Sequence, residues 1–138
     1  MKILLLGVGM QGKAALHDLV DSEPVQQIIA ADKDFDMLRK HVDGQAHSAK
    51  VSCEPLDAND PIGLAKQFAN HQPDVVIDLL PNIFNDIVAR AAVSHRAHYV
   101  NASYNTEGLT SLAAEAKARG IALLPECGMD PGLDLVLL

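Results

Sequence analysis

A glycine-rich hexapeptide near the start of the chain carries the clearest chemistry in this sequence. Residues 7–12 read GVGMQG and directly follow an apolar run at residues 3–6. Gly7 permits a tight turn, the missing side chain at Gly9 lets a pyrophosphate approach the backbone, and Gly12 allows a following helix to pack closely. Such a helix directs unpaired N–H groups and its positive dipole end at the phosphates. We therefore predict a phosphate-binding turn made by Gly7, Gly9, Met10, Gln11 and Gly12.

An aspartate further along the chain supports this interpretation of the turn. A second apolar stretch, residues 25–31, ends in Asp32, at the spacing where dinucleotide-binding proteins use an acid to hydrogen-bond the adenine ribose. The alternative is that Asp32 only caps the next helix. A carboxylate there repels a 2′-phosphate, so Asp32 favours NAD, while the neighbouring Lys33 keeps NADP possible. We predict that both residues lie at the ribose.

Two more segments are expected to reach the same ligand. Asp57 follows the third predicted strand, and its carboxylate either hydrogen-bonds the adenine amino group or caps the following helix. Leu80 and Pro81 follow the fourth predicted strand and are expected to form an apolar wall beside the ribose or nicotinamide.

The elements that must position these residues follow from the apolar patterning. Strands and helices alternate along the whole chain, which predicts an α/β fold: a Rossmann-type doubly wound parallel sheet with strand order 3-2-1-4-5-6. Asp60 before Pro61 predicts a helix start, and Gly120 predicts a helix end. The expected strands are residues 3–6, 25–31, 49–53, 74–80, 98–101 and 121–124, and the expected helices lie at 14–20, 35–41, 61–69, 83–94 and 106–119.

Composition excludes several classes of partner. The chain has 138 residues, 49% hydrophobic content and a net charge of -7, with eleven scattered Lys and Arg residues, so neither a nucleic acid nor an anionic membrane is expected. No apolar run is long enough for a membrane span or a secretory signal, and we expect a cytoplasmic protein. His95 and His98 are spaced so that they do not share a helical face, and no metal site is expected.

Three segments of the second half resemble one enzyme family. They read DLLP at residues 78–81, YVNASY at 99–104 and LPECGMDPGLD at 124–134. In order and spacing they resemble the saccharopine dehydrogenase family, in particular its saccharopine reductase branch. The resemblance implies an oxidoreductase that moves hydride between a nicotinamide and the CH–NH group of an amino-acid-type amine. It also implies that residues 1–138 form the N-terminal domain of a longer two-domain enzyme, which forms a homodimer through its C-terminal domain.

The same resemblance assigns substrate contacts to Ser103, Tyr104 and Asp130. Their chemistry fits a substrate with carboxylate and ammonium groups, because the two hydroxyls can donate to a carboxylate and Asp130 can pair with an amine. Each residue also has a plainer interpretation: Ser103 as a turn cap, Tyr104 as a half-buried ring, and Asp130 as a turn residue before Pro131.

A rival function is a nucleotide-sensing gating domain of a potassium transport system. Such domains also begin with a short strand, the glycine hexapeptide and a ribose-binding acid. They do not predict the Ser103-Tyr104 pair or the turn at residues 128–132.

Overall fold

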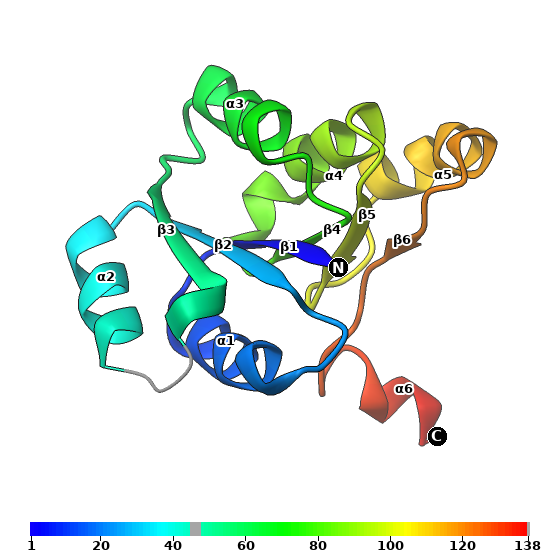
Figure 1. Ribbon diagram of the computed structural model, residues 1–138. Helices are drawn as coiled ribbons and strands as arrows, with labels where there is room; N and C mark the ends of the chain where they lie inside the picture. The colour runs from blue at the N-terminus through cyan, green and yellow to red at the C-terminus, as the bar shows by residue number, and fades with distance from the viewer. Residues whose placement is uncertain (45–47, 138) are drawn as a thin grey trace.

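The computed structural model describes residues 1–44 and 48–137 and contains one six-stranded parallel sheet with helices on both faces (Figure 1). The strand order is β3-β2-β1-β4-β5-β6, which confirms the predicted doubly wound topology. The strands are β1 (Lys2–Leu6), β2 (Gln27–Asp32), β3 (Val51–Pro55), β4 (Val75–Asp78), β5 (His98–Asn101) and β6 (Leu123–Leu124). The helices are α1 (Met10–Asp21), α2 (Phe35–Asp43), α3 (Pro61–His71), α4 (Asn85–Ser94), α5 (Glu107–Arg119) and α6 (Leu133–Val136), with 3-10 turns η1 (Ser48–Lys50) and η2 (Asn82–Phe84).

Strand β1 lies at the centre of the sheet and divides the core in two. Its alternate side chains point to opposite faces, as the period of two in a strand requires. Leu4 and Leu6 pack with α3, α4 and α5, while Ile3 and Leu5 pack with α1 and α2. Both faces are therefore covered, which explains why β1 is apolar from Ile3 to Leu6.

The predicted helix start at Asp60 and helix end at Gly120 are both confirmed. Asp34, Asp60 and Thr106 are the N-caps of α2, α3 and α5, and each side chain accepts a hydrogen bond from an amide two or three residues later. Gly120 ends α5 in the left-handed conformation, with φ of 73°.

Several strand boundaries differ from the predicted ones. Strand β3 is Val51–Pro55 rather than residues 49–53, because Ala49 lies in η1. Strand β4 ends at Asp78, whose own carboxylate accepts the Leu80 amide and turns the chain out of the sheet. The following helix is therefore split into η2 and α4, whereas apolar patterning predicted one helix over residues 83–94. Strands β2 and β6 are also shorter than predicted, and α6 was not predicted.

The last described segment leaves the body of the domain. Figure 1 shows α6 below and outside the layer formed by the sheet and its helices. Its apolar side chains are largely exposed: Leu133, Leu135 and Val136, together with Leu137. In residues 1–44 and 48–137, no helix is both long enough and apolar enough to cross a membrane.

Candidate functional site

The turn after β1 needs glycine at two positions for folding alone. Gly7 has φ of 82°, and a Cβ atom there would lie 2.7 Å from the Leu79 carbonyl oxygen. A Cβ atom on Gly12 would lie 2.1 Å from the Gly7 carbonyl oxygen, which is much shorter than a van der Waals contact. These glycines let α1 pack against the turn and let the turn pack against the segment after β4.

Gly9 is different, because no neighbouring protein atom requires glycine at this position. A Cβ atom there would meet no atom within 4 Å, so the space over the turn is open. Gly9 is also the N-cap of α1, where the first helical bond joins the Lys13 amide to the Gly9 carbonyl oxygen at 3.0 Å. The first turn of α1 has no acidic residue, and Met10 is 89% exposed. An open helix N-terminus with no acidic residue in its first turn fits a phosphate group.

Asp32 lies at the carboxyl end of β2, facing the glycine turn. Its Oδ2 atom accepts the Val8 amide at 2.7 Å, and its Oδ1 atom accepts the Asp34 amide at 2.9 Å. Asp34, not Asp32, caps α2. Each carboxylate oxygen has a second lone pair, so Asp32 can hold the turn and still accept a ribose hydroxyl.

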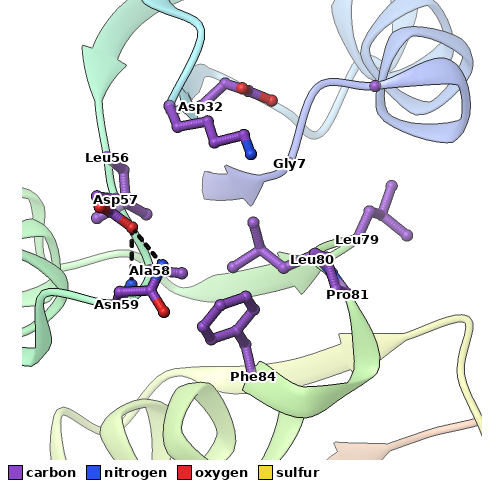
Figure 2. Close-up of a pocket in the computed structure, with 12 residues that line it drawn as sticks. Gly7, Asp32, Leu56, Asp57, Ala58, Asn59, Leu79, Leu80, Pro81 and Phe84 are labelled. Carbon is purple, nitrogen blue, oxygen red and sulfur yellow. Dashed lines mark hydrogen bonds between the residues drawn. The ribbon is translucent and has the colours of Figure 1, made fainter.

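A pocket of about 240 Å³ opens beside this turn (Figure 2). Seven of the predicted cofactor residues line it: Gly7, Gly9, Asp32, Lys33, Asp57, Leu80 and Pro81. Met10, Gln11 and Gly12 do not line it and lie in the first turn of α1. In Figure 2, the acidic side chain of Asp32 lies across the pocket from the apolar Leu80, Pro81 and Phe84.

Five more residues line the pocket beside these seven. They are Leu56, Ala58, Asn59, Leu79 and Phe84. Leu56, Ala58 and Asn59 belong to the segment around Asp57, which sequence analysis placed at this edge. No sequence pattern marked Phe84 as a pocket residue, because it reaches the pocket only through the unpredicted turn η2.

Asp57 does not act as a helix cap. Its Oδ1 atom accepts the backbone and side-chain amides of Asn59, each at 2.9 Å, while Asp60 caps α3. These two hydrogen bonds hold the pKa of the Asp57 carboxyl below its usual value. Asp57 is exposed at the mouth of the pocket with its other oxygen unbonded within residues 1–44 and 48–137.

The predicted substrate residues Tyr104 and Asp130 are brought together from segments far apart in the chain. The Tyr104 hydroxyl donates to Asp130 Oδ1 at 2.8 Å. This hydrogen bond, with the negative charge of Asp130, raises the pKa of Tyr104. Tyr104 is 60% exposed rather than half buried, so both side chains present polar atoms to solvent.

Backbone contacts fix this pair in place. The Glu126 amide donates to the Ser103 carbonyl oxygen, and the Cys127 amide donates to the Asn101 carbonyl oxygen, both at 2.9 Å. Gly132 has φ of 150°, and a Cβ atom there would lie 2.0 Å from the Gly128 carbonyl oxygen. The segment from 126 to 132 is therefore a compact turn held against the end of β5.

Ser103 does not cap its turn. Its amide donates to Asn101 Oδ1 at 3.2 Å, so Asn101 has the capping role. The Ser103 hydroxyl makes no hydrogen bond within the described part of the chain. It is free to donate to a bound group.

The two histidines considered as metal ligands have other contacts. His95 stacks on Phe68 with ring centroids 5.6 Å apart, and His98 Nδ1 accepts the Ala122 amide at 3.0 Å. Among the residues that the structure describes, no three His, Cys, Asp or Glu side chains are grouped to hold a metal ion.

The sheet order, the open glycine turn and the acid at the end of β2 together define a dinucleotide-binding Rossmann domain. The family described as "Saccharopine dehydrogenase NADP binding domain" matches residues 3–124. The chain belongs to this family, as its second-half motifs indicated.

Individual relatives agree with the family match. Saccharopine dehydrogenase (NADP(+), L-glutamate-forming) of Pyricularia oryzae is 33% identical over 96% of this chain. Mitochondrial alpha-aminoadipic semialdehyde synthase of Mus musculus is 30% identical over 99%. The chain spans only 28% and 14% of the lengths of these two relatives.

Solved structures show the same fold. Apo saccharopine dehydrogenase (L-Glu forming) of Saccharomyces cerevisiae superposes with a TM-score of 0.82 at 28% identity, covering 96% of this chain and 28% of that one. GenD2 from gentamicin A biosynthesis, solved in complex with NAD, superposes with a TM-score of 0.71 at 16% identity, covering 91% of this chain and 34% of that one. The latter likeness concerns the fold alone.

Proposed function

We propose that this chain is the nicotinamide-dinucleotide-binding part of a saccharopine dehydrogenase-type oxidoreductase that acts on the CH–NH group of an amino-acid-type amine. The observation that carries the proposal is the open space at Gly9, directly beside a pocket that contains Asp32. A glycine whose side-chain space the protein itself leaves open is what the approach of a pyrophosphate requires.

In this proposal each part of the dinucleotide has its own part of the site. The amides of the first turn of α1 hold the pyrophosphate, Asp32 and Lys33 contact the ribose, and the pocket at Asp57 takes the adenine. Leu80 and Pro81 form the apolar wall that excludes water on the other side. A nicotinamide held here would supply the hydride chemistry, as donor to or acceptor from the substrate carbon.

The substrate end is proposed to lie at Tyr104 and Asp130. A substrate that carries carboxylate and ammonium groups needs both hydroxyl donors and an anion, and these two residues with Ser103 supply them. In this proposal the Ser103 and Tyr104 hydroxyls donate to the carboxylate, while Asp130 pairs with the amine.

Substitution of Gly9 by alanine tests cofactor binding directly. We expect Gly9→Ala to fold as the wild type does, because the added methyl group meets no protein atom, and to bind NADH and NADPH at least tenfold more weakly. Calorimetric titration measures the affinity, and circular dichroism checks folding. Gly44→Ala is the matched control, since its Cβ atom also fits, with its nearest contacts at 3.6 Å, and it lies outside the pocket.

Equal affinity of Gly9→Ala and wild type would remove the pyrophosphate from this turn. Loss of affinity in both glycine variants would indicate a general effect of the added methyl groups.

The choice between NAD and NADP rests on two adjacent residues of opposite charge. We predicted NAD from Asp32, whereas the relative from Pyricularia oryzae is named for NADP(+). We propose that both cofactors enter this pocket, with Asp32 accepting a free 2′-hydroxyl and the exposed Lys33 ammonium pairing with a 2′-phosphate.

Replacement of Lys33 is expected to change the affinities for the two cofactors differently. We expect Lys33→Gln to weaken NADPH binding about tenfold through loss of one charge-assisted contact and to leave NADH binding within about twofold. Parallel titrations with the two cofactors measure this. The exposed Lys40→Gln on α2, outside the pocket, is the control. An equal effect of Lys33→Gln on both cofactors would show that Lys33 does not contact the 2′-phosphate.

The wider context of the domain is also a proposal. We propose that a second domain in the intact enzyme completes the substrate site and forms a homodimer, and that the enzyme is cytoplasmic. The relatives' greater length supports a further domain. The potassium-transport alternative has no observation in its favour, since the oxidoreductase family match runs through residues 3–124.

A further inference from the structure

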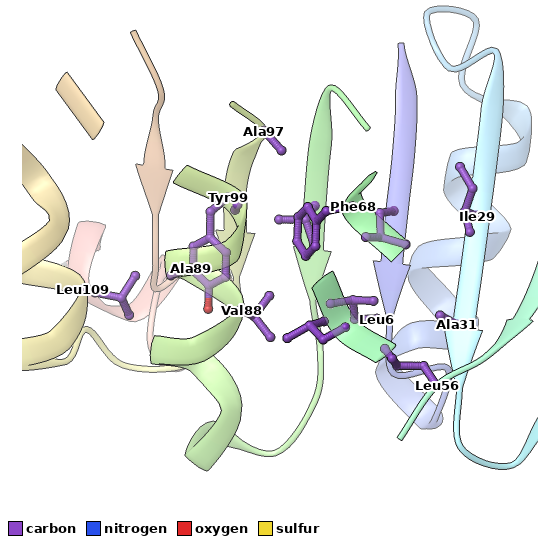
Figure 3. Packing of buried hydrophobic residues seen from close by; sticks show 14 of the residues in the cluster. Leu6, Ile29, Ala31, Leu56, Phe68, Val88, Ala89, Ala97, Tyr99 and Leu109 are labelled. Atoms are coloured by element: carbon purple, nitrogen blue, oxygen red, sulfur yellow. The ribbon is translucent and has the colours of Figure 1, made fainter. Parts of the chain in front are cut away.

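Three polar side chains are buried at the carboxyl ends of β4 and β5. Asp78 is 1% exposed, Tyr99 is 0% exposed and Asn101 is 1% exposed. Asp78 and Asn101 are register partners on adjacent strands, so their side chains lie on the same face of the sheet. Figure 3 shows the Tyr99 ring beside Val88 and Ala89 of α4, with its hydroxyl oxygen turned away from Ala97.

These side chains form one continuous series of hydrogen bonds. The Tyr99 hydroxyl donates to Asp78 Oδ2 at 3.0 Å and accepts from Asn101 Nδ2 at 2.7 Å. Asp78 Oδ1 accepts the Leu80 amide at 3.1 Å, and Asn101 Oδ1 accepts the Ser103 amide at 3.2 Å. We call Asp78, Tyr99 and Asn101 the buried relay.

The direction of every hydrogen bond in the relay is determined. Because Asn101 Oδ1 receives the Ser103 amide, its Nδ2 must face Tyr99. The single hydroxyl proton of Tyr99 then has to point at Asp78, which must accept it. A substitution that places a donor where an acceptor is needed therefore also disturbs the neighbouring hydrogen bond, as expected for a connected network.

The two ends of the relay are backbone amides of functional segments. Leu80 lines the dinucleotide pocket, and Ser103 begins the segment that contains Tyr104. An apolar core could end these strands at lower cost, because burying polar groups is unfavourable unless every hydrogen bond is made. Core packing alone therefore does not explain the three buried polar side chains of the relay.

We propose that the buried relay is a positioning unit that fixes the cofactor-binding turn after β4 relative to the substrate-binding turn after β5, so that filling one turn alters the other. This inference rests on the proposed function, which assigns the turns to cofactor and substrate. None of the three residues touches either ligand in the proposal; they act through Leu80 and Ser103.

Tyr99→Phe removes the central hydroxyl and keeps the ring. Amide resonances of isotope-labelled protein are followed while NADPH is added. In the wild type we expect both the Leu80 and Ser103 signals to shift with the same midpoint. In Tyr99→Phe the Leu80 shift is retained and the Ser103 shift falls at least threefold, because the connection is cut between them.

Val93→Ala is the matched control, since Val93 is buried on α4 and lies outside the relay. It lowers stability by core truncation and should leave the Ser103 response intact. A wild-type Ser103 response in Tyr99→Phe, or an equal loss in Val93→Ala, overturns the proposal. Asp78→Asn provides a second cut, because its NH2 group must face one of the two donors, the Leu80 amide or the Tyr99 hydroxyl, that the two Asp78 oxygens now accept.

Hydrogen exchange distinguishes failure of the relay from failure of the proposed function. If NADPH shifts no signal at Gly9, Asp32 or Leu80 in the wild type, the cofactor assignment fails. The relay is then judged without ligand: Tyr99→Phe should accelerate exchange of the Leu80 and Ser103 amides together by about tenfold, the size expected for one hydrogen bond. Unchanged exchange at both amides, or a change at only one, overturns it.

Discussion

Asp78 is the residue whose environment departs furthest from that of an ordinary carboxyl group. Burial raises its pKa from 3.8 to about 6, although the Leu80 amide and the Tyr99 hydroxyl both favour the charged form. The native state therefore binds this proton more tightly than the unfolded chain does. The stabilisation from that proton is complete below about pH 3.8 and is lost as the pH rises through about 6.

Asp78→Asn removes this pH dependence. A shift of about two pKa units corresponds to roughly 3 kcal/mol, so the unfolding free energy of wild type should fall by that amount relative to Asp78→Asn between pH 3.5 and pH 7.5. Urea unfolding of both proteins across this range measures the difference. Asp18→Asn on the surface of α1 serves as the control for general charge effects. A pH-independent difference between wild type and Asp78→Asn would show that the Asp78 pKa is not raised.

At the scale of elements, the sequence predicts what local chemistry decides. The hexapeptide, the cap at Asp60 and the stop at Gly120 are local signals, and the elements begin or end there. The strand order also follows, because alternating strands and helices leave few right-handed topologies.

Features that depend on distant contacts are not predictable in the same way. Apolar patterning extends the fourth strand to Leu80, but the hydrogen bond from Leu80 to the Asp78 side chain ends it earlier. The turn η2 that follows brings Phe84 to the pocket, and no local pattern marks that residue. The buried relay is not predictable for a related reason: Tyr99 has the sequence pattern of an ordinary core strand residue, and only its contact with Asp78 of β4 distinguishes it.

At the scale of the whole molecule, the site lies along one edge of the sheet. The glycine turn follows β1, Asp32 ends β2, the pocket wall follows β4, and Ser103 follows β5. The carboxyl ends of parallel strands all lie at this edge, so residues from across the chain meet there. Asp57 follows β3 and Asp130 follows β6, so the proposed ligand contacts involve the ends of all six strands.

Cofactor binding should consequently stabilise the domain as a unit. A ligand that binds only the native state, present at about 100 times its dissociation constant, raises the unfolding free energy by about 2.7 kcal/mol. For a chain of this length that is a rise of several degrees in Tm. Calorimetric scans with increasing NADPH or NADH measure it, with Gly9→Ala showing about half of the rise or less and Gly44→Ala the full rise, because only the former fills the phosphate space. A Tm independent of cofactor in the wild type would mean that this edge of the sheet does not bind the dinucleotide.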